Sequence, residues 1–354
     1  MSIRYGIIGT GMMGCEHIRN LLQIEGTKIT AIADINEESK NWGINACAGK
    51  FSPKVFNNYE ELLACDEVDA VVVATPNFTH IDVMREIFKT DKHVLLEKPM
   101  CTSVEDAKEV VQSSKSHEGV VWIGLEYRYM ATISAALDNL EAVGDIRMFA
   151  IREHRFPFLK KVNNWNRFNR NTGGTLVEKC CHFFDLMNQV IPSDPISVFA
   201  SGGQDVNHLQ EAYAGETSDI LDNAYVIVNY ANGARALLDL CMFAEGSEHE
   251  QEIAVTGDKG KIETTVPGKE LIISRRSSNN FKRVPIESDP RIKEQGFHHG
   301  ASYLEHLDFL DAINNQTLPA VTVNDGLMSM VLGIAAQQSI ETGQLVKISD
   351  TLAG

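Results

Sequence analysis

The stretch TGGTLVEKCCHFFDL, from Thr172 to Leu186, contains several side chains that can do chemistry. Two adjacent cysteines, Cys180 and Cys181, stand beside His182, and Glu178 comes four residues before the histidine. Thiols and imidazoles bind metals, thiol pairs take part in redox reactions, and a histidine near a carboxylate can move protons. These residue types therefore allow a metal site, a redox pair or an acid–base pair.

The two cysteines are best interpreted as packing side chains. Successive residues of a helix point about 100° apart, so Cys180 and Cys181 make a poor pair of ligands for one zinc ion. The sequence offers no second ligand pair at zinc-site spacing, and we expect no metal. The seven cysteines are scattered and no signal peptide is visible, which favours reduced thiols in a cytoplasmic protein.

Glu178 and His182 are the more informative pair. Residues four apart lie on one face of a helix, and the ordinary pKa of histidine suits a general base near neutral pH. Glu178 also has a structural interpretation. Thr175 suits an N-cap after Gly173-Gly174, and T-x-x-E is the pattern of a capping box. Both roles for Glu178, in a site or at the helix end, stay open.

A glycine loop near the amino terminus predicts a dinucleotide site. GIIGTGMMG places Gly9, Gly11 and Gly14 in a G-x-G-x-x-G pattern, after a short apolar strand and at the start of a helix. The first glycine permits the tight turn, the second lets the backbone approach a pyrophosphate, and the third lets helix and strand pack closely. The N–H groups at the helix N-terminus suit the phosphates.

Asp34 indicates which dinucleotide binds. It ends the next strand, 20 residues after Gly14, where a carboxylate accepts hydrogen bonds from the adenosine ribose hydroxyls. The same charge repels a 2′-phosphate, and the segment DINEES has no arginine to compensate. We therefore expect NAD as the cofactor, with NADP less favoured.

Strands and helices alternate through the first 125 residues. Apolar runs such as KITAIAD, DAVVVATP and HVLLEKP are separated by helical patterns, for example over 81–89 and 104–114. Near-continuous apolar strands are typical of a parallel sheet covered on both faces. We therefore predict an α/β fold that begins with a doubly wound Rossmann domain over 1–125.

The pattern changes after Tyr129. Longer strands such as IRMFAIREHRF and AYVIVNY mix apolar and polar residues, and turns such as Asn232-Gly233 separate several of them. Helices are predicted around 176–190, 301–315 and 325–342. We therefore predict a second, α+β domain over 126–354 with a large, mostly antiparallel open sheet.

The composition limits the partners. The chain has 354 residues, 32 Lys and Arg against 48 Asp and Glu, and a formal net charge of −16. A general binder of nucleic acid or anionic membranes needs a basic face, which this balance disfavours. No apolar run approaches the roughly 20 residues of a membrane span. We expect neither a nucleic-acid nor a membrane partner.

Two further motifs resemble those of a known family. They are VVVATPNFTH, from Val71 to His80, and HVLLEKPM, from His93 to Met100. Together with the glycine loop and GGTLVEKCCHFFD, they resemble the Gfo/Idh/MocA family, which includes glucose–fructose oxidoreductase and inositol dehydrogenase. The resemblance covers the whole chain in order and layout. It implies a dinucleotide domain, then a domain that binds substrate and forms a homo-oligomer, a dimer or tetramer.

The resemblance also implies roles for individual residues. Lys98 would be catalytic, near the nicotinamide and the reacting carbon, and Pro99 would form a cis peptide. His182 would accept the substrate proton, and Glu178, where the family usually has aspartate, would contact substrate or orient that base. Asn77 either lines the cofactor or caps the helix predicted after it. The implied cofactor-binding residues are Gly9, Gly11, Met12, Met13, Gly14, Asp34, Ile35, Thr75, Pro76, Asn77, His80, Glu97 and Lys98.

A basic cluster precedes the segment of Glu178 and His182. In relatives this region covers the substrate, which implies substrate contacts for Trp165 and Arg167, and also for Arg128 just after the first domain. Pairing of the cluster with acidic residues elsewhere is the alternative. The cluster consists of Arg152, Arg155, Lys160, Lys161, Arg167 and Arg170, with Glu153 alone opposing them.

These observations lead us to expect an NAD-dependent oxidoreductase. It would transfer a hydride between a secondary alcohol of a cyclic polyol or sugar, including sugar acids, and the nicotinamide. Two alternatives are an NAD-dependent glycosidase of the same fold, in which the cofactor is regenerated within each turnover, and a non-catalytic NAD-binding regulator. The presence of both Lys98 and His182 argues against the regulator.

Overall fold

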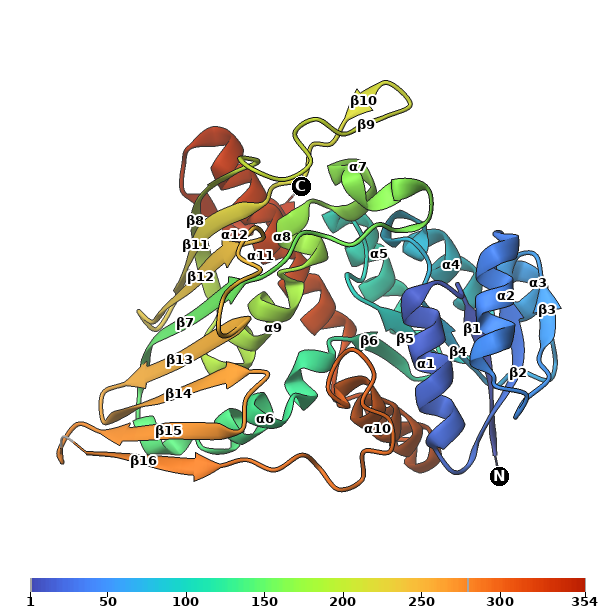
Figure 1. Cartoon of the computed structure of the whole chain (residues 1–354), viewed down its shortest axis with the longest axis horizontal. Helices are drawn as coiled ribbons and strands as arrows, with labels where there is room; N and C mark the ends of the chain where they lie inside the picture. Colours follow the sequence, from blue (N-terminus) through green and yellow to red (C-terminus); the bar gives the residue numbers. More distant parts are fainter. Residues whose placement is uncertain (1, 279, 354) are drawn as a thin grey trace. The chain divides into compact units, whose positions relative to one another are not determined.

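The computed structural model describes residues 2–278 and 280–353, which separate into two units (Figure 1). Unit 1 comprises Met1–Tyr129 and Pro290–Leu327, and unit 2 comprises Met130–Asp289 and Met328–Gly354. The first segment thus ends at Tyr129 rather than at 125. Residues 290–327, which the sequence places in the second domain over 126–354, group with unit 1 in the structure.

Unit 1 contains a six-stranded parallel sheet in the order β3-β2-β1-β4-β5-β6 (Figure 1). This is the strand order of a doubly wound dinucleotide-binding domain and confirms the predicted Rossmann fold. The central strands β4 and β5 are buried on both faces, which explains their continuous apolar sequences. The strands are β1 Ile3–Ile8, β2 Thr27–Ala33, β3 Lys54–Phe56, β4 Ala70–Val73, β5 His93–Glu97 and β6 Val121–Gly124.

The helices between these strands begin in two ways. Those that follow Asn36, Asn58 and Ser103 are capped, because each of these side chains accepts a hydrogen bond from a backbone N–H of the first turn. Helix α1 begins after Gly11 and has no side-chain cap. The elements are α1 Met12–Gln23, α2 Glu37–Ala46, α3 Tyr59–Leu63, η1 Asn77–Thr79, α4 His80–Ile87, α5 Val104–Ser114 and η2 Glu126–Tyr129.

The returning segment completes the core of unit 1 with helix α10, Ala301–Asn315. The indole Nε1 of Trp122, on β6, donates to Glu305 Oε1 at 3.2 Å. The ring of Phe309 meets the same tryptophan edge to face, with ring centroids 6.1 Å apart. These contacts bury a large aromatic surface and a polar pair, and they explain why residues 290–327 fold with the Rossmann sheet.

Unit 2 contains a nine-stranded sheet in the order β16-β15-β14-β13-β7-β12-β11-β8-β17. Strands β7 and β12 are parallel and the other neighbouring pairs are antiparallel, which confirms a large, mostly antiparallel sheet. The strands are β7 Ile146–His154, β8 Pro195–Gly203, β11 Asn223–Tyr230, β12 Arg235–Cys241, β13 Gln251–Gly257, β14 Gly260–Val266, β15 Glu270–Arg275, β16 Asn280–Pro285 and β17 Val346–Lys347; β9 Ala212–Tyr213 and β10 Glu216–Thr217 form a separate hairpin.

Helices α6, α9 and α12 of unit 2 pack on strands β14, β7 and β8 respectively. The helix predicted over 176–190 is two helices, α8 and α9, separated by a turn at Lys179 and Cys180. No helix within 2–278 or 280–353 is both long and apolar enough to cross a bilayer. The helices are α6 Ala131–Asp138, α7 Asn169–Thr172, α8 Thr175–Glu178, α9 Cys181–Val190 and α12 Ile348–Ala353, with η3 Leu140–Val143 and η4 Val162–Arg167; α11, Val323–Thr342, begins in unit 1 and continues in unit 2.

Candidate functional site

The three glycines of the loop between β1 and α1 have different surroundings. Gly9 has a φ of +87°, and a Cβ there would lie 2.7 Å from the carbonyl carbon of Ala74, just after β4. A Cβ on Gly14 would lie 2.0 Å from the carbonyl oxygen of Gly9. A Cβ on Gly11 would meet no atom within 4 Å. Packing of the protein therefore requires the first and third glycines, whereas the second leaves open space where a pyrophosphate would approach.

Asp34 is held beside this loop by the backbone around it. Its carboxylate accepts the N–H of Thr10 at 2.8 Å, the hydroxyl of Thr10 at 3.3 Å and the N–H of Asn36 at 2.8 Å. A carboxylate has about four acceptor positions, so these bonds orient it and still leave room for a ribose hydroxyl. Ile35, next to it, is 88% exposed. The uncapped N-terminus of α1, the space at Gly11 and this carboxylate together fit a bound dinucleotide.

Two alanine variants should separate cofactor binding from folding. Gly11→Ala should lower the free energy of unfolding by no more than about 1 kcal/mol, yet weaken NADH binding about tenfold or more, because the methyl group enters the pyrophosphate's space. Gly14→Ala should lower the melting temperature clearly, because its Cβ would overlap backbone. Calorimetry and fluorescence titration with NADH measure the two effects. Unchanged NADH affinity in Gly11→Ala would contradict the predicted pyrophosphate position.

A buried histidine joins the loops that follow β4 and β5. The ring of His80 is fully buried, with Nε2 3.0 Å from the carbonyl oxygen of Thr75 and Nδ1 2.9 Å from that of Pro99. The Lys98–Pro99 peptide is cis, as the resemblance implied. Asn77 begins η1 and does not cap α4, whose N-cap is Thr79, so the capping interpretation of Asn77 is wrong.

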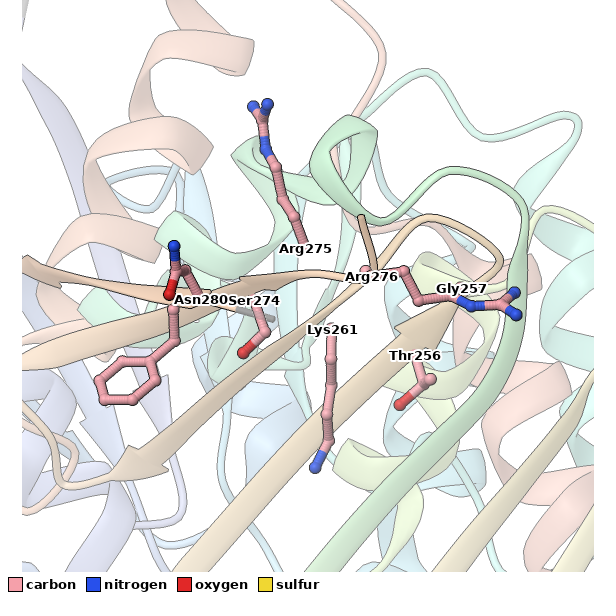
Figure 2. Close-up of a pocket in the computed structure, with 9 residues that line it drawn as sticks. Thr256, Gly257, Lys261, Ser274, Arg275, Arg276 and Asn280 are labelled. Atoms are coloured by element: carbon pink, nitrogen blue, oxygen red, sulfur yellow. The ribbon is translucent and has the colours of Figure 1, made fainter. Parts of the chain in front are cut away.

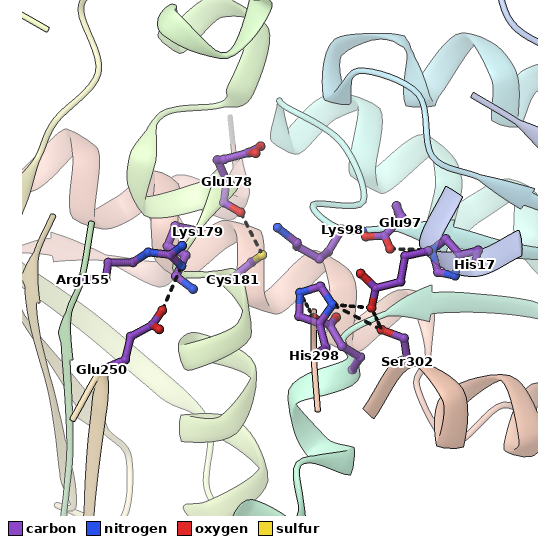
Figure 3. A network of polar contacts seen from close by, with 12 residues as sticks. His17, Glu97, Lys98, Arg155, Glu178, Lys179, Cys181, Glu250, His298 and Ser302 are labelled. Atoms are coloured by element: carbon purple, nitrogen blue, oxygen red, sulfur yellow. Dashed lines mark hydrogen bonds and ion pairs between the residues drawn. The ribbon is translucent and has the colours of Figure 1, made fainter. Parts of the chain in front are cut away.

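Glu97 and Lys98 lie at the carboxyl end of β5, with the Glu97 side chain almost fully buried (Figure 3). Glu97 Oε1 is 2.7 Å from His17 Nε2, and Glu97 Oε2 accepts the N–H of Lys98 at 3.1 Å. Burial by itself would raise the pKa of Glu97, but the hydrogen bond from His17 and the charges of His17 and Lys98 hold that pKa at about 2. Glu97 is therefore a carboxylate at neutral pH, and its charge favours the ammonium form of Lys98.

A second polar cluster of unit 1 surrounds His298 (Figure 3). Its Nδ1 lies 3.0 Å from Glu16 Oε1, which also accepts the hydroxyl of Ser302 at 3.2 Å, and its Nε2 lies 3.5 Å from Glu126 Oε1. Burial opposes charging of His298, but the carboxylates of Glu126 and Glu16 raise its pKa. Sequence reasoning missed Glu16 and His17. The available signal was a Glu-His pair just inside the helix that follows the glycine loop.

Glu178 and His182 lie in unit 2, on either side of the turn between α8 and α9, and both are buried. The N-cap of α8 is Gly174, so Thr175 is already inside the helix. The hydroxyl of Thr175 donates instead to the carbonyl of Leu221 at 2.6 Å. The capping-box interpretation of Glu178 is therefore wrong, because T-x-x-E begins one residue too late. A role of Glu178 in a site stays a prediction.

An ion-pair network anchors the turn between α8 and α9 to the sheet (Figure 3). Lys179 Nζ lies 2.9 Å from Glu153 Oε1 on β7, and 5.4 Å from the centroid of the Phe183 ring. Arg155 lies 3.3 Å from the same Glu153 oxygen and 3.4 Å from Glu250 Oε1. Glu153 is fully buried, so losing either cation would leave costly uncompensated charge. The network fixes the residues that flank His182.

The cysteines beside His182 are packing residues, as predicted. Cys180 and Cys181 are both fully buried, and Cys181 Sγ lies 3.9 Å from the carbonyl oxygen of Glu178. In the described part of the chain, no group of three or more His, Cys, Asp or Glu side chains is placed to hold a metal ion.

Ion pairing accounts for four arginines of the basic cluster. Arg167, although it is only 1% exposed, lies with Nε 3.2 Å from Glu211 Oε2 and donates from Nη2 to the carbonyl of Phe158 at 3.1 Å. The substrate contacts of Arg128, Trp165 and Arg167 stay predictions. The ion pairs are Arg152–Glu252, Arg155–Glu153, Arg167–Glu211, Arg170–Glu216 and, in unit 1, Arg128–Asp325.

An open pocket of about 390 Å³ lies on the outer strands β13–β16 of unit 2 (Figure 2). Three cationic side chains, Lys261, Arg275 and Arg276, line it together with the hydroxyls of Thr256 and Ser274. None of the predicted site residues is among its lining residues. The pocket is therefore separate from the chemistry predicted for Glu178 and His182.

Known proteins match the chain along most of its length. Residues 3–125 match the NAD-binding Rossmann fold of an oxidoreductase family, and residues 139–348 match the C-terminal alpha/beta domain of the same family. Myo-inositol 2-dehydrogenase of Thermotoga maritima is 26% identical over 99% of this chain and 100% of its own. Inositol 2-dehydrogenase of Rhizobium meliloti is 23% identical over 99% of this chain and 100% of its own.

Solved structures share the fold. Levoglucosan dehydrogenase in complex with NADH and levoglucosan superposes with a TM-score of 0.85 at 19% identity, over 98% of this chain and 100% of that one. The family matches cover the Rossmann sheet with its NAD-binding glycine loop and most of the domain built on the nine-stranded sheet. The chain belongs to the Gfo/Idh/MocA family of NAD-binding oxidoreductases.

Proposed function

We propose that this protein is an NAD-dependent dehydrogenase of a secondary alcohol on a cyclic polyol or sugar. The observation that carries the proposal is the end of β5, where a buried carboxylate and a lysine follow each other at the carboxyl edge of the NAD-binding sheet. Ligands of doubly wound sheets bind at this edge. The relatives named as inositol 2-dehydrogenases support the substrate class.

The proposed roles follow from the chemistry of each side chain. NAD, when bound, supplies the acceptor for a hydride from the substrate carbon. Lys98 donates a hydrogen bond from its ammonium to the substrate oxygen and stabilises negative charge there as the proton leaves. His182 accepts that proton. Glu178, four residues earlier and buried, contacts the substrate or orients the imidazole.

The proposed cofactor contacts use the same sheet edge of unit 1. The N-terminus of α1 with Gly11 takes the pyrophosphate, and Asp34 takes the adenosine ribose. The segment Thr75–Asn77 and the Glu97–Lys98 turn take the nicotinamide end. His80 acts by joining these two loops, because its ring is fully buried between their carbonyls.

A substrate screen tests the function. Inositols, sugars and sugar acids are supplied with NAD or NADP while absorbance of the reduced cofactor is followed. Steady NADH formation from a free polyol is the expected result. Release of product from a glycoside without net NADH would establish the glycosidase instead. Faster reaction with NADP than with NAD would contradict the role given to Asp34.

We also propose that unit 2 pairs with a second copy of the chain through the uncovered face of its sheet. Large apolar side chains alternate with buried ones there and stand 37–62% exposed: Met148, Phe199, Tyr225, Ile227 and Leu237. Leu237 lies opposite Ile227, which lies opposite Phe199, so three of them form one row across the sheet. Contiguous exposed apolar patches of this kind mark interaction surfaces.

Leu237→Asp should therefore reduce the oligomer to monomers, because it places a charge in the middle of that row. The mass in solution, from light scattering after size-exclusion chromatography, measures the effect. Leu318→Asp is the matched control, since Leu318 is 90% exposed on unit 1 and lies outside the row. Equal masses for both variants and the unchanged protein would overturn the proposal.

A further inference from the structure

A chain of three buried side chains leads from the interior of unit 1 to Lys98. His306 Nε2, on α10, lies 2.8 Å from His17 Nδ1 on α1, and His17 Nε2 lies 2.7 Å from Glu97 Oε1. Both histidines are 0% exposed and Glu97 is 6% exposed. Glu97 Oε2 then accepts the backbone N–H of Lys98 (Figure 3).

The acceptor at the end of this chain dictates where the protons lie. An ionised Glu97 has no proton to donate and acts only as a hydrogen-bond acceptor. His17 must therefore direct an N–H at it from Nε2. If His17 is neutral, its Nδ1 accepts from His306; if His17 is protonated, its Nδ1 donates to His306. The two arrangements differ by one proton, and Glu97 keeps its donor in both.

The surroundings favour a neutral His306 and an ionised Glu97. Burial, together with the charge of His17, lowers the pKa of His306 well below its ordinary value. Burial also raises the pKa of Glu305 well above its ordinary value, with the charges of Glu126 and Glu97 adding to the effect. The titratable groups that face the chain from neighbouring elements are Tyr5, Glu16, Lys98, Glu126, His298 and Glu305.

We propose that His17 and His306 are positioning residues for the dehydrogenase reaction. They hold Glu97 as a carboxylate, and Glu97 in turn keeps Lys98 an ammonium and fixes its backbone at the end of β5. This inference rests on the role proposed for Lys98. It adds two fully buried residues that are 289 positions apart in the sequence.

His17→Leu, His17→Gln and His306→Leu test the chain by their pH profiles. His17→Leu should lower kcat at neutral pH by about 10- to 100-fold, the range for partners that act through another group. The acid limb of its kcat profile should move to higher pH, because burial without the donor raises the pKa of Glu97. His17→Gln retains an N–H at the Nε2 position and should restore most of kcat. His306→Leu should move the acid limb in the same direction by less.

His117→Gln is the matched control. This histidine also belongs to unit 1, and its Nε2 lies 2.9 Å from the carbonyl oxygen of Lys92, just before the opposite end of β5. It should leave the kcat profile where it is. An acid limb that does not move in His17→Leu, or a His17→Gln variant as impaired as His17→Leu, would overturn the proposed positioning role.

A measurement without turnover separates this inference from the proposed function. The pKa of folded Glu97 lies below its ordinary value, so its stabilisation is complete above about pH 4.3 and is lost as the pH falls toward about 2. In His17→Leu the pKa of folded Glu97 no longer lies well below its ordinary value, so the loss of melting temperature between about pH 4.3 and about 2 should be smaller than in the unchanged protein or in His117→Gln. If no polyol is turned over, the proposed function fails, while the altered melting profile of His17→Leu still supports the positioning role of His17 and His306. Identical melting profiles would overturn that role.

Discussion

Lys98→Met should lower kcat/KM for the polyol substrate by about 10²- to 10³-fold, the loss typical of removing one donor from developing negative charge. Methionine retains the length and the apolar stem of lysine but offers neither a charge nor an N–H. The loss should appear mainly in kcat, because the hydrogen bond strengthens as the substrate oxygen becomes negative. The affinity for NADH, measured by fluorescence titration, should change far less than kcat/KM.

Lys92→Met is the control for this variant. Lys92 precedes the opposite end of β5, where its ammonium donates to the carbonyls of Cys65 and Val68 at 3.3 Å and 2.7 Å. Its removal should lower the melting temperature and leave kcat/KM of the folded protein unchanged. Full activity of Lys98→Met, or equal losses in the two variants, would exclude Lys98 as the donor.

His182→Asn should lower kcat by about 10²- to 10⁴-fold, the range for loss of a general base. The deficit should shrink as the pH rises, because hydroxide increasingly replaces the missing proton acceptor. Steady-state kinetics across the pH range measure both effects. His154→Asn is the control, since His154 is also in unit 2 and pairs with a carboxylate, Asp239, at 3.0 Å. A deficit in His182→Asn that is constant with pH would contradict the base.

The double variant Lys98→Met, His182→Asn connects the two predictions. If both residues serve the same proton and hydride transfer, the combined loss should be much smaller than the product of the single losses. Fully multiplied losses would mean that the two residues act on separate steps. This result would contradict the proposed mechanism without contradicting either residue's importance.

The Rossmann half was predictable because its signals are local. Continuous apolar strands, a glycine loop and Asp34 at a fixed distance from it lie within the first 34 residues, and each has one main structural explanation. The exposed edge strand β16 was missed, since its residues are almost all exposed and do not alternate. The capping box failed for a different reason. The hydroxyl of Thr175 donates a hydrogen bond to the carbonyl of Leu221, 46 residues away, and the local sequence pattern cannot reveal this contact.

The polar interior of unit 1 was hidden by sequence distance. His17 follows the glycine loop and His306 lies in a helix assigned to the second domain, so nothing local connects them. Buried polar groups of this kind pair with one another, because a buried polar atom without a hydrogen-bond partner lowers the stability of the fold. Partners of this kind follow from the three-dimensional packing and not from spacing along the chain.

The return of residues 290–327 to unit 1 has a consequence for synthesis on the ribosome. All six strands of the Rossmann sheet have been made once residue 124 has been added, yet α10 does not exist until residue 315. During that interval Trp122 lacks the carboxylate of Glu305, and His17 lacks His306. Part of the core of unit 1 therefore stays exposed on the nascent protein while residues 130–289 of unit 2 are translated. Premature termination anywhere before residue 301 would yield chains without this helix, which we expect to be prone to aggregation.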